Sequence, residues 1–278
     1  MNDAPYANKT KHEAEMTHEH PPVLFVGAGP GDPELITVKG QKALAQADLI
    51  IYAGSLVPEA VLKWTRSSAR ILNSAGMALK EIVTEMENAW LEGQHVVRLH
   101  TGDPSLYGAI FEQMAELNRQ SIPYRVIPGV TAAFAAAAAM GIEYTLPEVS
   151  QTLIITRMEG RTPVPEKEAL ASLAAHQTTM AIYLSVGMID KVAEVLQAAY
   201  GLSAPCAVVY RASQPDEKIV YSTLDRLVEA VDRAGIRRQA VIIVGRVLDV
   251  SLESLRHKSK LYDAGFAHGF RAGDGETN

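Results

Sequence analysis

The sequence predicts an α/β protein with two α/β domains, the first built on a mainly parallel sheet and the second on a mixed sheet. Residues 23–127 alternate short apolar runs with amphipathic segments, which is the pattern of β-α repetition. In the second half, the apolar runs Ala207–Tyr210 and Ile219–Ser222 are close enough to form neighbouring antiparallel strands. The chain has 278 residues, which is long for a single core, so two domains are expected.

In the first half, each expected strand is followed by an expected helix. Val23–Val26 is a short apolar run of the kind found in buried strands. A helix is expected where Leu79, Ile82, Val83, Met86 and Trp90 recur on one helical face. The other expected elements here are the helix Glu34–Ala47, the strands Leu49–Tyr52, His95–Leu99 and Tyr124–Ile127, and the helix Leu106–Leu117.

The second half begins near Thr152, and the best domain boundary is the Leu146-Pro147 pair. This divides the chain into domains at 22–147 and 148–250. A polar segment at 1–21 reads as a disordered tail, and the polar, glycine-containing segment 251–278 reads as an appendage. Further expected elements are the strands Leu153–Thr156, Met180–Leu184 and Ala240–Val247, and the helices Ile189–Ala199 and Leu224–Ala234.

Composition excludes several classes of protein. The formal net charge is −6, whereas nucleic-acid binders usually have a basic excess, so no nucleic-acid partner is expected. No apolar stretch has the length of a membrane span, and no signal segment is recognisable, so the expected location is the cytoplasm. A single cysteine, Cys206, excludes an internal disulfide. His12, His18 and His20 have no thiol or carboxylate to complete a metal shell, so no metal site is expected.

A glycine-rich turn, GAGPGD at residues 27–32, lies between the first expected strand and the first expected helix. Glycines let the backbone approach a ligand closely and adopt positive φ. The dinucleotide fingerprint G-x-G-x-x-G needs a glycine where this chain has Asp32, and no acidic residue closes the second strand. NAD binding is therefore disfavoured, and a tight turn without any ligand remains an alternative.

Two further small-residue turns follow strands at the same expected edge of the sheet. They are GDP at 102–104 and PGVTAA at 128–133. Asp103 is a candidate acceptor for ligand donors or a helix cap, and Thr131 is likewise a candidate ligand contact or cap. Three such turns at one edge favour a nucleoside ligand. None has the lysine of a phosphate-binding loop, so a nucleoside without phosphates, such as S-adenosylmethionine, fits best.

These three motifs together resemble the tetrapyrrole class of S-adenosylmethionine methyltransferases over residues 22–250. The run Tyr52–Val57 and the run LHTGDPSLYGA at 99–109 are similar to the members that methylate precorrin-4 at C-11 in cobalamin biosynthesis. The resemblance implies two α/β domains with a cleft between them, a homodimer, and S-adenosylmethionine as methyl donor with S-adenosylhomocysteine as product. It also implies a set of cofactor contacts: Pro30, Thr101, Gly102, Asp103, Leu106, Thr131, Ala132, Leu184 and Ala212.

The implied substrate is a tetrapyrrole with many carboxylates, which arginine recognises well. Arginines expected at strand ends facing the cleft are Arg98, Arg157, Arg161 and Arg211. Tyr107 and Tyr183 are candidates to stack on the macrocycle, with a core role as the alternative. A general base cannot be assigned from the sequence, and no residue must ligate cobalt. The metal-free substrate is therefore slightly preferred over the cobalt-bearing one.

One position departs from the wider class. The related uroporphyrinogen methyltransferases have an aspartate after the tyrosine that ends the second strand, where this chain has Ala53-Gly54 after Tyr52. This lowers the expectation of uroporphyrinogen as substrate. Other hypotheses are a methyltransferase of the same fold acting on RNA or on a modified histidine, a nicotinamide-dependent oxidoreductase, and a non-catalytic nucleotide-binding module.

Overall fold

The structure is a computed structural model that describes residues 20–255 and 259–271. Most of the predicted N-terminal tail, including His12 and His18, lies outside the described residues, as do positions 256–258 and 272–278 of the predicted appendage. The chain forms two compact units, residues 1–131 and 132–278. The domain boundary at Leu146-Pro147 stays a prediction.

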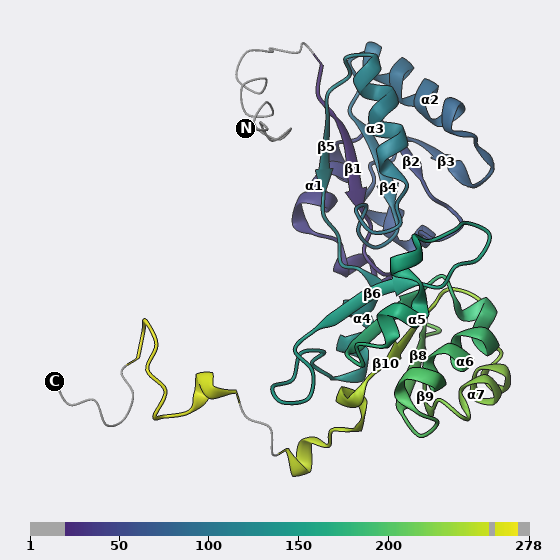
Figure 1. Cartoon of the computed structure of the whole chain (residues 1–278). Helices are drawn as coiled ribbons and strands as arrows, with labels where there is room; N and C mark the ends of the chain where they lie inside the picture. Colours follow the sequence, from purple (N-terminus) through teal and green to yellow (C-terminus); the bar gives the residue numbers. More distant parts are fainter. Residues whose placement is uncertain (1–19, 256–258, 272–278) are drawn as a thin grey trace, which may run out of the picture. The chain divides into compact units, whose positions relative to one another are not determined.

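The first unit is built on a five-stranded parallel sheet in the order β3-β2-β4-β1-β5 (Figure 1). This confirms the parallel sheet predicted from the β-α repetition. All five strands end at one edge, and β1 lies between β4 and β5, so the loops after these three strands are neighbours. The strands are β1 (Val23–Gly27), β2 (Leu49–Tyr52), β3 (Arg70–Asn73), β4 (Val96–His100) and β5 (Tyr124–Ile127).

Helices cover both faces of this sheet because the side chains of a strand alternate between its two faces. On one face, α1 (Val38–Gln46) contributes Ala43 and Leu44 to a core with alternate strand residues. On the other face, α2 (Leu79–Leu91) and α3 (Ile110–Arg119) pack on the remaining strand residues. The helical periodicity predicted over residues 79–90 is confirmed by α2.

The second unit has a mixed sheet in the order β6-β7-β10-β8-β9, in which only β6 and β7 pair in parallel. The predicted antiparallel pair in this half is confirmed as β8 with β9. The strands are β6 (Leu153–Arg157), β7 (Thr179–Tyr183), β8 (Pro205–Tyr210), β9 (Lys218–Thr223) and β10 (Ala240–Val244).

The described residues of the second unit include four α-helices. They are α4 (Ala132–Met140), α5 (Leu170–Ala174), α6 (Ile189–Tyr200) and α7 (Leu227–Ala234). Residues of α5, α6 and α7 share one core with one face of the sheet. Figure 1 shows α6 and α7 beside β8 and β9. The alanines of α4 pack on residues from the other face.

Several predicted elements were wrong in extent. The helix expected over 34–47 is interrupted, because Ile36 and Thr37 are extended and the Thr37 side chain caps α1 by accepting the Gly40 N–H. The helix expected from Leu106 begins only at Ile110, after left-handed residues at Tyr107 and Ala109. The edge strand β3 and the short helix α5 were not predicted at all. Three residues of β3 are exposed, so its sequence lacks the apolar run of a buried strand.

Within the described part of the chain, no helix has both the length and the apolar character needed to cross a membrane.

Candidate cofactor-binding site

The three glycine-bearing turns of the first unit touch one another at the carboxyl edge of the sheet. A Cβ added to Gly27 would lie 2.6 Å from both the Gly102 carbonyl oxygen and the Gly129 Cα. A Cβ added to Gly129 would overlap the Gly102 oxygen and lie 2.8 Å from the Gly27 Cα. Real side chains do not tolerate such distances, so only glycine permits this approach. The predicted convergence of the three turns is confirmed.

Backbone hydrogen bonds join the first turn to the second. The Ala28 N–H donates to the His100 carbonyl at 2.7 Å. Gly29 and Gly102 exchange N–H···O bonds of 3.2 and 2.8 Å as an isolated bridge beyond the sheet. Both glycines have positive φ, 78° and 59°, which favours glycine at these two positions. The first and second turns are therefore one continuous structure. Together with the third turn they form the rim, residues 27–32, 102–104 and 128–133.

Asp103 ties the second turn to the third. One carboxylate oxygen accepts the Gly129 N–H at 2.8 Å, and the other accepts the Ser105 N–H at 2.8 Å. Of the two predicted roles, a cap on the following helix is wrong in detail, because α3 begins only at Ile110. The carboxylate instead holds two backbone segments in register, and its role as a ligand contact stays a prediction.

Of the nine described residues other than glycine with left-handed backbone, five lie in or beside the predicted contact segments. In the first unit, Tyr107 and Ala109 have φ of 56° and 49°. In the second unit, Leu184 has φ of 54° and is 65% exposed, while Arg211 and Ser213 on either side of Ala212 have φ of 47° and 68°. Such conformations are costly and cluster at ligand sites, so they support a binding role for these segments.

The start of α4 is anchored by two tyrosines. The Tyr183 hydroxyl accepts the Ala133 N–H at 2.6 Å, and the Tyr144 hydroxyl donates to the Ala133 carbonyl at 2.6 Å. Burial, followed by the nearby Tyr183, raises the pKa of Tyr144, so it remains a donor. These bonds fix the helix turn that follows Thr131 and Ala132. They also give the Tyr183 hydroxyl a structural contact, as in the predicted alternative to macrocycle stacking.

The four predicted substrate arginines differ in availability. Arg98 is only 5% exposed and donates to Gln113 Oε1 and the Ile51 carbonyl, so the expectation that it faces a ligand is wrong in this structure. Arg157 donates to carbonyls of its own loop, at Thr162 and Pro163. The other two arginines are Arg211, which bonds Gln214 and Asp216, and Arg161, which is exposed and has no side-chain partner among the described residues.

Burial also shifts the pKa values of His100 and Cys206. His100 is 4% exposed, and burial, followed by the charge of Arg98, lowers its pKa to about 3. Its Nε2 has no hydrogen-bond partner among the described residues. Burial raises the pKa of Cys206 to about 12, with a further contribution from Asp225, so the thiol stays protonated and is a poor nucleophile. Neither group is placed to act as an acid or base at neutral pH.

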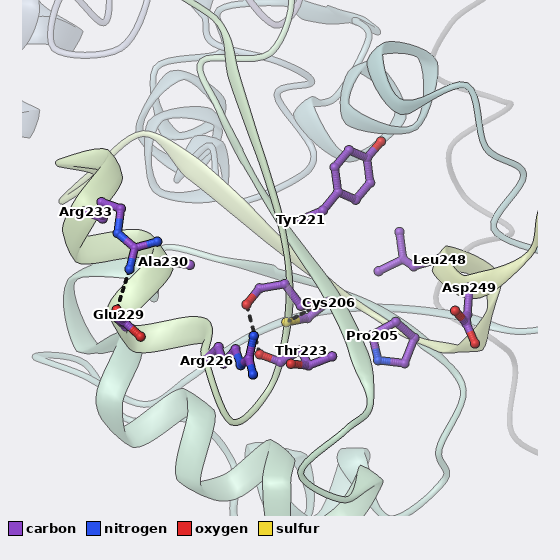
Figure 2. Close-up of a pocket in the computed structure, with 11 residues that line it drawn as sticks. Pro205, Cys206, Tyr221, Thr223, Arg226, Glu229, Ala230, Arg233, Leu248 and Asp249 are labelled. Carbon is purple, nitrogen blue, oxygen red and sulfur yellow. Dashed lines mark hydrogen bonds and ion pairs between the residues drawn. The ribbon is translucent and has the colours of Figure 1, made fainter.

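A surface pocket of the second unit lies elsewhere, between β8, β9, α7 and the turn after β10 (Figure 2). It contains none of the predicted cofactor or substrate residues. Figure 2 shows Arg233 paired with Glu229 at one side of it. The described residues contain no cluster of three or more His, Cys, Asp or Glu side chains placed to hold a metal ion. The lining residues are Pro205, Cys206, Tyr221, Ser222, Thr223, Arg226, Glu229, Ala230, Arg233, Leu248 and Asp249.

Sequence reasoning missed Gln113 and Tyr144, which hold the backbone of the predicted contact segments in place. Gln113 lies in α3 and is 5% exposed, and Tyr144 follows α4 and is also 5% exposed. Neither belongs to a motif, and a lone glutamine or tyrosine in an apolar stretch gives no signal of the carbonyl that it will meet. Their partners are set by the tertiary fold.

Comparison with known proteins agrees with this geometry. The cobalt-precorrin-4 C(11)-methyltransferase of Methanocaldococcus jannaschii is 56% identical over 250 residues, covering 90% of this chain and 95% of the relative. The precorrin-4 C(11)-methyltransferase of Pseudomonas aeruginosa is 48% identical over 252 residues, covering 91% and 99%.

Solved structures share the fold. The X-ray structure of a cobalt-precorrin-4 methyltransferase matches with a TM-score of 0.80 and 49% identity, covering 82% of this chain and 96% of that one. The uroporphyrin-III C-methyltransferase of Thermus thermophilus, complexed with S-adenosylhomocysteine, matches with a TM-score of 0.68 and 29% identity, covering 82% and 93%. The model of the tetrapyrrole (corrin/porphyrin) methylases matches residues 22–228. The chain belongs to the tetrapyrrole methylase family.

Proposed function

We propose that this chain transfers a methyl group from S-adenosylmethionine to C-11 of precorrin-4, giving precorrin-5 in cobalamin biosynthesis. The observation that most supports it is the rim of Gly27, Gly102 and Gly129, where three turns meet at the carboxyl edge of a parallel sheet. A rim of backbone groups without a phosphate-binding lysine suits a nucleoside that carries no phosphates. The narrower substrate is supported by 48% identity to a precorrin-4 C(11)-methyltransferase and 56% identity to a cobalt-precorrin-4 C(11)-methyltransferase.

The residues present fit the methyl donor. The left-handed Gly102 is only partly buried, and a Cβ added there would meet no atom closer than 3.7 Å, so a nucleoside can lie close to its backbone. The proposed contacts in the first unit are Pro30, Thr101, Gly102, Asp103, Leu106 and Thr131, and those in the second are Ala132, Leu184 and Ala212. The exposed, left-handed Leu184 and the strained residues around Ala212 support the second group.

The chain acts mainly by orientation. When bound, S-adenosylmethionine supplies an electrophilic methyl group, and the ring carbon of the substrate is the nucleophile. The rim fixed by Asp103 holds one partner rigidly, and such orientation is worth effective molarities of about 10⁵–10⁸ M in intramolecular reactions. Neither the neutral His100 nor the buried Cys206 takes part in proton transfer, so the base is left unassigned.

For the substrate carboxylates, we propose Arg161 as the principal ligand, because its exposed guanidinium has no partner among the described residues. Arg157 and Arg211 each retain donors beyond those used within their own loops, and they are proposed as secondary contacts. Tyr107, 44% exposed on a left-handed turn, is proposed to lie against the macrocycle. The assembly is proposed to be a cytoplasmic homodimer without a nucleic-acid partner.

A second candidate is the same methylation of cobalt-precorrin-4. It is favoured by the higher identity to a relative named for the cobalt-bearing substrate, 56% against 48% for the precorrin-4 relative. The two substrates share the ring carbon and the peripheral carboxylates, so the same site serves both.

The test supplies the purified protein with labelled S-adenosylmethionine and, separately, precorrin-4, cobalt-precorrin-4 and uroporphyrinogen III. Label is expected in one or both precorrin-4 products at C-11, and the relative kcat/KM ranks the two candidates. Binding of S-adenosylhomocysteine, but not NAD, is expected in calorimetry. Methylation of uroporphyrinogen III alone, or binding of NAD alone, would contradict the proposal. Arg161→Ala is expected to raise KM for the tetrapyrrole without changing S-adenosylhomocysteine affinity.

A further inference from the structure

A buried arginine without a carboxylate partner lies beneath the rim. Arg98 is in β4, paired in register with Phe25 of β1 and Ile51 of β2, which belong to the core under α2 and α3. It is 5% exposed, and no ion pair to it is found among the described residues. Burial lowers its pKa only to about 10, so the guanidinium remains charged at neutral pH. A buried unpaired charge is costly, so Arg98 is poorly suited to a role in core stability alone.

The bonds of this arginine lead to the predicted cofactor segment. Arg98 Nε donates to Gln113 Oε1 at 3.0 Å, and Nη1 donates to the Ile51 carbonyl at 3.1 Å. Gln113 Nε2 in turn donates to the Ala109 carbonyl at 3.2 Å. Arginine has no acceptor, so the Gln113 amide oxygen must face it, and this leaves the amide NH₂ to face Ala109. The direction of the relay is therefore fixed by chemistry.

Ala109 ends the predicted cofactor segment, Thr101–Ala109, in an unfavourable backbone conformation. It has φ of 49°, precedes α3 directly, and follows a second left-handed residue, Tyr107, at φ of 56°. The other end of the segment, Thr101, continues from β4, and Asp103 fixes the middle through Gly129. The relay joins Ala109 to the sheet beneath it, and without the relay the left-handed alanine is expected to relax to a commoner conformation.

We infer that Arg98 and Gln113 are positioning residues that hold the segment Thr101–Ala109 in its cofactor-binding conformation. The inference rests on the proposed function, because that segment is the proposed second contact with the methyl donor. The guanidinium is suited to the task because its rigid fork reaches β2 and α3 together, and its charge polarises the Gln113 amide, which strengthens the bond to Ala109. Arg98 thus acts through backbone geometry and not by touching the substrate.

The decisive variant is Gln113→Glu. It keeps an acceptor for Arg98 and pairs the buried charge, so the fold is retained, but at neutral pH its side chain has no donor for the Ala109 carbonyl. The dissociation constant of S-adenosylhomocysteine, measured by calorimetry, is expected to rise by about tenfold, the effect of one lost hydrogen bond. KM for S-adenosylmethionine is expected to rise by a similar factor while KM for the tetrapyrrole is unchanged. Amide hydrogen exchange is expected to accelerate across residues 101–109.

Two further variants and one control test the relay: Gln113→Asn, Arg98→Lys and Tyr200→Phe. Gln113→Asn is one methylene too short to reach both partners, and Arg98→Lys keeps the charge without the fork, so both are expected to weaken S-adenosylhomocysteine binding. Tyr200→Phe is the matched control, because it removes a 2.7 Å bond to the Thr178 carbonyl in the second unit. It is expected to lower stability and leave S-adenosylhomocysteine affinity at the wild-type value.

Three results would overturn the inference. If the Gln113 and Arg98 variants lose stability but bind S-adenosylhomocysteine like the wild type, the relay only supports the fold, and the proposed function stands. If Arg98→Lys raises KM for the tetrapyrrole alone, Arg98 is a substrate ligand. If the wild-type protein itself fails to bind S-adenosylhomocysteine, the proposed function fails together with the inference.

Discussion

The contact among three glycines can be tested by adding one methyl group. In Gly129→Ala, the new Cβ overlaps the Gly102 carbonyl oxygen and lies 2.8 and 3.0 Å from the Gly27 Cα and carbonyl carbon. All three atoms are backbone, so no side chain can rotate away, and the turns must separate. Overpacking costs typically about 1–3 kcal/mol, and the upper end is expected here because nothing flexible is available to move.

Two measurements check this prediction. A loss of about 3 kcal/mol should lower the melting temperature by about 6–12 °C for a chain of this size. Separation of the turns should also displace the methyl donor, and a misplacement of about 1 Å can reduce kcat/KM by about 100-fold. The S-adenosylhomocysteine dissociation constant should therefore rise together with the loss of stability.

Gly76→Ala is the control for Gly129→Ala. Gly76 lies after β3, in the same unit. A Cβ there would meet no atom within 4 Å, and the backbone of Gly76 does not have positive φ. It should leave melting temperature and S-adenosylhomocysteine affinity unchanged. If Gly129→Ala matched Gly76→Ala in both measurements, the three turns would not be in the tight contact argued here, and the rim could not be the basis of binding.

The remaining predictions concern side chains around the rim and α4. Tyr183→Phe leaves the buried Ala133 N–H without its acceptor, so urea unfolding should show a loss of about 1–3 kcal/mol, with weaker S-adenosylhomocysteine binding through the displaced start of α4. Asp103→Ala removes two charge-assisted bonds and should cost about 2–3 kcal/mol and abolish S-adenosylhomocysteine binding, whereas a mere cap would cost about 1 kcal/mol and leave binding intact. His100 has a folded-state pKa of about 3, below the unfolded value of 6.5, so its contribution to stability is complete above pH 6.5 and is lost as the pH falls toward 3. Urea unfolding should show a slope of about 1.4 kcal/mol per pH unit from this group below pH 6.5, which His100→Gln removes.

Local sequence patterns predicted the buried elements of the fold best. Strands β2 and β5 match their predicted limits, because a short apolar run between turn residues has few alternative structures. The edge strand β3 was missed because Arg70 and Asn73 at its ends face solvent and pairing occurs on one side only. α3 was predicted four residues too long at its start, because apolar spacing continues through Tyr107 although the backbone there is left-handed.

Some features of the site could be predicted from the sequence and others could not. The meeting of the three turns was predictable, because parallel strands end at one edge and glycine marks close approach. The burial and hydrogen bonding of the arginines were not predictable, since a charged side chain at a strand end is expected to face solvent until its partners are known. Arg98 alternates onto the α2 and α3 face, where Gln113 provides an acceptor from fifteen residues away. Only the register of β4 and α3 reveals that pairing.

The polar groups at the rim also limit what chemistry this chain must supply. Asp103 accepts two backbone N–H groups, and buried His100 is neutral at physiological pH. The Asp103 carboxylate is therefore engaged in holding backbone, and the His100 side chain carries no charge. A displacement in which the two reacting atoms come from the bound molecules needs no ionised side chain between them, only fixed distances and the exclusion of water. The rigid, glycine-built rim is suited to that task, which is why we place its contribution in orientation and not in acid–base catalysis.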